Sequence, residues 1–164
     1  MLEVLLRKLL CMLKQRRKER HIMFGKPHNG WTDVLVDNDI DNAEKIIWKV
    51  SYLSNVPKIV LEAIRDHYVN RKPQHVELEM EEYGVGSMLI RSDGEIVFIN
   101  TCYEHPTAYY NHIDNVVDEI LKDFDTNIDE WSKFFCGIHN DEEAEIEKEV
   151  ISTLIAQIKK KKGR

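Results

Sequence analysis

A thiol, a carboxylate and two imidazoles lie close together in the middle of the chain, at Cys102, Glu104, His105 and His112. A cysteine beside a histidine is the pairing of thiol hydrolases, and these side chains are also zinc ligands. No two of them have the i, i+4 spacing of a helical zinc site, and nothing nearby marks an oxyanion donor. We therefore keep a metal-dependent or thiol hydrolase using the Cys102–His112 loop as an alternative, and expect the protein not to be an enzyme.

Two other patterns could suggest chemistry but do not support it. His67 and His75 flank the end of a predicted helix and the start of a predicted strand, without cysteines nearby. Gly84-Val-Gly86 is too short for a phosphate-binding loop and lies between strands, not before a helix. We expect no metal and no cofactor.

The stronger pattern is acidic. Residues 75–82 alternate strictly, with Val76, Leu78 and Met80 on one face and Glu77, Glu79 and Glu81 on the other. One interpretation is a charged edge that resists aggregation. The other is a recognition face for Lys and Arg on a partner, anchored by tyrosines. The candidate partner-binding residues are Glu77, Glu79, Glu81, Glu82, Tyr83, Asp93, Glu95, Tyr103, Glu104 and Tyr109.

A hairpin is expected to position the centre of this face. Asp93-Gly94 between two apolar runs predicts a two-residue turn. The expected cross-strand pairs are Ile90 with Val97, Met88 with Ile99, and Leu89 with Phe98. Both faces of such a hairpin are apolar, so we expect helices over both, or nearly so.

The remaining periodicities predict an α+β fold. We expect an antiparallel sheet of three to four strands, at about 45–53, 75–82, 87–91 and 95–101, although a helix over 45–53 stays possible. Amphipathic helices are expected at 57–70, 112–124, 129–135 and 141–158, and at the N-terminus. Residues 106–111 are interpreted as a loop.

The charge is unevenly distributed. The chain of 164 residues has a net charge of −6, but residues 29–158 hold ten basic and 27 acidic residues, a net of −17. Basic residues gather in 1–28 and in the last six positions. Such a negative field favours solubility, and it also steers a basic partner towards the protein.

Residues 1–22 form a predicted basic amphipathic helix, and 23–164 a single domain. The helix either docks on the core, or lies on a membrane or partner, or precedes a true start at Met23. A membrane-peripheral module held by residues 1–20 is thus a further alternative. Arg7 and Lys8 interrupt its apolar run, which excludes a spanning segment of about 20 residues.

Three scattered cysteines indicate no disulfide framework, so we expect a cytoplasmic protein. In its small size, acidity, mixed fold and lack of catalytic motifs, the chain resembles the immunity proteins of bacterial toxin systems. That resemblance implies a binding protein that occludes the active site of a basic toxin, of the nuclease type. We expect a basic protein partner and no direct contact with nucleic acid.

Overall fold

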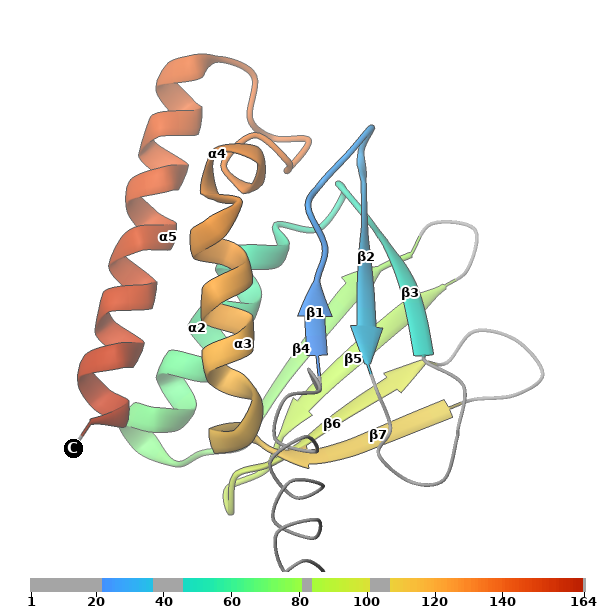
Figure 1. Ribbon diagram of the computed structural model, residues 1–164, viewed down its shortest axis with the longest axis vertical. Coiled ribbons are helices and arrows are strands. Elements are labelled where there is room, and N and C mark those ends of the chain that lie inside the picture. Colours follow the sequence, from blue (N-terminus) through green and yellow to red (C-terminus); the bar gives the residue numbers. More distant parts are fainter. Residues whose placement is uncertain (1–21, 37–45, 81–83, 101–106, 164) are drawn as a thin grey trace, which may run out of the picture.

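The computed structural model describes residues 22–36, 46–80, 84–100 and 107–163 (Figure 1). Its strands and helices form an α+β fold, as predicted. The elements, in chain order, are β1 (Ile22–Phe24), β2 (Trp31–Val36), β3 (Ile46–Ser51), α2 (Val56–Asn70), β4 (Gln74–Glu79), β5 (Val85–Ile90), β6 (Glu95–Asn100), β7 (Thr107–His112), α3 (Ile113–Thr126), α4 (Ile128–Trp131) and α5 (Asp141–Lys162). The predicted N-terminal helix lies outside the described residues.

The strands form two antiparallel sheets, in the orders β1-β2-β3 and β4-β5-β6-β7. The expected single sheet therefore needs correction, because the segment at 46–51 belongs to the first sheet and not to the second. The loop expected at 106–111 also needs correction, because Thr107–His112 form a strand that pairs with β6 along its whole length. A strand there satisfies the backbone groups of β6, which would otherwise be an unpaired edge.

The three-stranded sheet lies across one face of the four-stranded sheet, in front of it in Figure 1. The Trp48 ring of β3 packs 5.6 Å from the ring of Phe98 on β6. It also covers Gly86, where a Cβ would come within 3.3 Å of the indole and 3.0 Å of Met80 Sδ. A glycine at this position thus allows the two sheets to approach closely.

Helices form the other wall of the core, to the left in Figure 1. The helices expected at 57–70, 112–124 and 141–158 are present with nearly those bounds. The Phe24 ring of β1 lies 5.0 Å from Phe124 of α3, and Phe124 lies 5.1 Å from Trp131. These contacts make one continuous core from the helices to both sheets.

Helix α3 also binds the free edge of the three-stranded sheet. The Ile22 N–H donates to Glu119 Oε2 at 2.9 Å, and the Phe24 N–H donates to Asp123 Oδ2 at 2.9 Å. Two residues along a strand and four residues along a helix both span about 6–7 Å. The two strand N–H groups therefore line up with the two helix carboxylates. The two carboxylates give this sheet edge hydrogen-bond acceptors where no further strand follows.

The β5–β6 hairpin has a different register from the predicted one. Its loop has three residues, because the Arg91 N–H donates to Glu95 O at 2.8 Å and the Gly94 N–H to Arg91 O at 3.0 Å. Gly94 has a φ of 91°, as in a type I turn closed by a glycine bulge. The pairs are therefore Met88 with Phe98, Leu89 with Val97, and Ile90 with Ile96. This shift places Phe98 in the core and Val97 on the opposite face.

We expect Asp123→Ala to lower the free energy of unfolding by about 1–3 kcal/mol, because it leaves the buried Phe24 N–H without this acceptor. The measurement is chemical denaturation followed by fluorescence. The control is Asp125→Ala on the same helix, which removes only an exposed ion pair of 3.7 Å with Lys159. Its expected cost is below about 1 kcal/mol. Equal losses in the two variants would show that the edge contact does not stabilise the fold.

Candidate binding surface

The four-stranded sheet has one face in the core and one face turned away from it. Val76 and Leu78 of β4 are buried, while the alternating Glu77 and Glu79 are exposed. We call the second face the outer face. Its residues are His75, Glu77, Glu79, Val85, Ser87, Leu89, Glu95, Val97, Ile99, Ala108, Tyr110 and His112.

Pairing arranges the outer face in rows across the strands. One row runs His75, Leu89, Val97, Tyr110, and the next runs Glu77, Ser87, Ile99, Ala108. Val97 is only 6% exposed, yet it does not belong to the core cluster. The Tyr110 side chain is 62% exposed. Leu89, Val97 and Tyr110 form an apolar strip on this face, and within the described part of the chain no helix covers it. The expectation of helices over both hairpin faces stays a prediction.

Two predicted acidic residues stand at one border of the strip. Glu77 Oε1 lies 4.0 Å from His75 Nε2, and no Lys or Arg of the described residues pairs with Glu77 or Glu79. The backbone N–H of Glu79 donates to Ser54 Oγ at 2.9 Å, which anchors that end of β4. These carboxylates are thus held on a strand and accessible to a partner.

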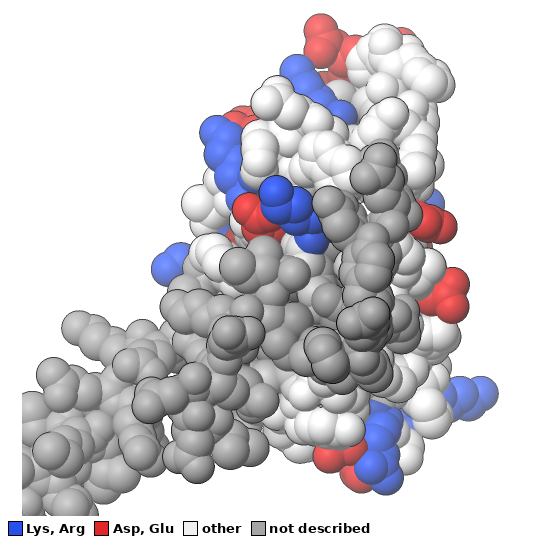
Figure 2. Space-filling view, turned by 90° about the vertical axis from the view of Figure 1, so that its right-hand side faces the viewer, with Lys and Arg blue, Asp and Glu red and all other residues white. Residues whose placement is uncertain are grey.

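The acidic residues of the hairpin are partly neutralised. Arg91 pairs with Glu95 at 2.7 Å and with Asp93 at 3.8 Å. The hydrogen bond that Arg91 donates to Glu95, together with the charge of Asp93, raises the pKa of Arg91 above its ordinary value. The hairpin end therefore carries mixed charge, and the predicted acidic face does not continue undiminished into it. Figure 2 likewise shows both signs of charge intermixed on the side that it presents.

The tyrosine anchor needs a correction. Tyr109, a predicted partner-binding residue, is 2% exposed and lies in the core, with its ring 6.2 Å from Phe98. The neighbouring Tyr110 is the exposed one, because strand alternation turns it to the outer face. A period-two interpretation of residues 107–112 would have separated the two rings. The other candidates, Glu81, Glu82, Tyr83, Tyr103 and Glu104, lie outside the described residues.

Of the members of the proposed catalytic loop, the structure describes only His112, which stands at the end of β7. Its Nδ1 accepts from the Asp114 N–H at 3.3 Å and its Nε2 lies 3.2 Å from Asp93 O. His112 therefore caps α3 and holds the hairpin. Cys102, Glu104 and His105 lie outside the described residues.

Two further searches concern the described residues alone. They contain no group of three or more His, Cys, Asp or Glu side chains able to hold a metal ion. None of their helices is long and apolar enough to cross a membrane.

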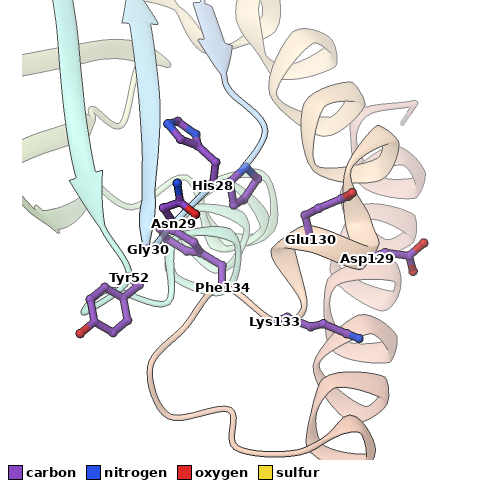
Figure 3. A pocket seen from close by; sticks show the side chains of 9 residues that line it. His28, Asn29, Gly30, Tyr52, Asp129, Glu130, Lys133 and Phe134 are labelled. Carbon is purple, nitrogen blue, oxygen red and sulfur yellow. The ribbon is translucent and has the colours of Figure 1, made fainter.

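A groove of about 640 Å³ lies between the β1–β2 turn, the end of β3 and α4 (Figure 3). Its charged side chains are engaged outside it. Glu130 pairs with Lys26 at 2.6 Å and Asp129 with Lys148 at 2.6 Å. Lys133 also pairs outwards, with Asp141 at 3.2 Å. The other side chains that line it are those of Pro27, His28, Asn29, Tyr52 and Phe134.

A buried histidine lies where α2 meets α3. His67 is 0% exposed, and its Nδ1 has no hydrogen-bond partner among the described residues. Its Nε2 lies 3.3 Å from Arg71 Nη1. Burial and then the Arg71 guanidinium lower the pKa of His67, with His112 adding to this and Asp114 and the Lys72 backbone opposing it. The fold therefore favours the neutral form of this imidazole.

In comparisons with known proteins, no family model, no curated protein and no solved structure matches this chain.

His67 makes stability depend on pH. Because the pKa of His67 is lower in the folded chain, the unfolded chain binds a proton at this site more tightly. The free energy of unfolding should therefore fall as pH drops below about 6.5. The contribution is at most about 1.4 kcal/mol per pH unit, down to the lowered folded pKa. His67→Phe should lose this part of the slope in denaturation curves, whereas His139→Phe, at an exposed position, should keep it. An unchanged slope in His67→Phe would contradict the assignment.

Proposed function

We propose that this protein binds and neutralises a basic protein partner, as immunity proteins do, with the outer face of its four-stranded sheet as the contact surface. The observation that carries the proposal is the pair Glu77 and Glu79, exposed on β4 without Lys or Arg partners among the described residues. Beside them lies an apolar strip that ends in Tyr110. An apolar centre with charge at its border is the anatomy of a protein interface.

Most other carboxylates of the described residues already have partners inside the molecule. Lys162 pairs with Asp118 at 2.6 Å and Lys159 with Asp125 at 3.7 Å, so the basic C-terminal run neutralises α3. Glu147, which is buried, accepts from Asn55 Nδ2 at 2.9 Å. A partner gains little by competing for such groups. Glu77 and Glu79 remain available for new ion pairs.

The charge and the apolar strip have different roles in this function. The net of −17 over residues 29–158 attracts a basic partner at long range and raises the association rate. Tyr110 and the strip provide the contact that slows dissociation, since aromatic anchors dominate interface energies. In this proposal, the protein inhibits its partner by binding alone, so it needs only the residues of the contact.

The test begins with partners captured from the native source at low salt, and proceeds to association rates with the purified partner. Glu77→Lys with Glu79→Lys should lower the association rate by about tenfold or more. Glu145→Lys with Glu149→Lys is the control, because these exposed residues of α5 give the same change in net charge at another place.

The result has three decisive outcomes. A basic partner whose binding falls only in the β4 variant supports both the function and its place. Equal losses in both variants would contradict the outer face as the contact. An acidic partner, or no partner at any salt concentration, would overturn the function itself.

A further inference from the structure

β7 ends the four-stranded sheet, and the direction of its backbone groups follows from the hydrogen bonds at its end. The Ile113 N–H donates to Gly94 O at 2.8 Å, towards the hairpin, and the His112 N–H donates to Asn111 Oδ1 at 2.7 Å. Because N–H directions alternate along a strand, those of Ala108 and Tyr110 point away from β6. No described residue binds these two N–H groups or the carbonyls beside them.

The two edges of the sheet differ in how they are protected. β4 carries the charges of Glu77 and Glu79, and Ser54 takes up one outward N–H. β7, with the sequence Thr-Ala-Tyr-Tyr-Asn-His, has no Lys, Asp, Glu or Pro, and it pairs with β6 without a bulge. An uncharged, regular edge strand without these devices is a template for another strand.

We infer that β7 pairs antiparallel with β7 of a second copy of this chain, joining two four-stranded sheets into one across a two-fold axis. The net charge of −6 on each chain opposes the approach of two copies at long range, but β7 itself brings no carboxylate against that of its copy. At the other edge, Glu77 and Glu79 of one copy would face those of the next. The pairing therefore closes at two copies and does not extend into a fibre.

The outward groups also define a register. Placing Ala108 opposite Tyr110 of the second copy aligns the outward N–H and C=O groups of both strands, with Tyr109 at the axis. The small Ala108 side chain then leaves room on the outer face for the Tyr110 ring of the second copy. The apolar strip of each copy continues into that of the other. The β4 borders remain free at both ends of the joined sheet.

The contact is small, so the dimer should be weak and concentration-dependent. Sedimentation velocity from low-micromolar to near-millimolar concentration measures it. Ala108→Pro removes one outward donor without breaking a β6–β7 hydrogen bond, which is where an edge strand tolerates proline. Tyr110→Lys places a charge at the contact. Val69→Lys on α2 is the control, because Val69 is 55% exposed and gains the same charge.

We expect the wild-type chain and Val69→Lys to dimerise alike, and both β7 variants to raise the dissociation constant by about tenfold or more. Amide hydrogen exchange at Ala108 and Tyr110 should slow as the wild-type concentration rises. A monomer at all concentrations would overturn the inference. So would a dimer that neither variant weakens, or one that leaves exchange at these amides unchanged. Tyr110→Lys alone decides the question if Ala108→Pro does not fold.

Discussion

The packing of Trp48 over Gly86 is the contact on which the arrangement of this molecule depends. The indole reaches Phe98 because residue 86 has no side chain in its way. The three-stranded sheet can therefore lie flat against one face of the four-stranded sheet. Once that face is filled, strand alternation turns the remaining side chains to the other face, away from the core. The outer face is a consequence of this packing.

The helical layer packs against the sheets with apolar side chains, and the carboxylates of α3 add polar contacts to this packing. Glu119 and Asp123 accept from the edge of β1, while Asp118 and Asp125 hold the lysines of α5. The acidity of α3 is therefore mostly structural. A net charge counted along the sequence therefore overstates how many carboxylates are available to a partner. Carboxylates bound within the molecule contribute to the long-range field but offer few new contacts.

The β4 and β7 borders of the outer face differ in chemistry. One suits a different protein as partner, and the other suits a second copy of this chain. The β4 border has accessible carboxylates, suited to a basic surface. The β7 border has outward backbone groups that no described residue binds, and a tyrosine, and it is suited to another strand. Because the two borders lie at opposite edges of one sheet, both contacts can form on the same molecule. A dimer would then present two acidic borders to its partners.

Sequence periodicity alone determined the amphipathic helices, the alternation of β4 and the α+β class, because each depends on neighbours within a few residues. Tertiary structure decided the rest. The strand at 107–112 was missed, and Tyr109 was mistaken for the exposed ring, because pairing with β6 sets that strand's faces. The hairpin register depended on Gly94 adopting a bulge, which exchanged the faces of Val97 and Phe98 relative to the predicted pairing. Which carboxylates remain available depended on Lys and Arg distant in the sequence, and local pattern carries no information about such contacts.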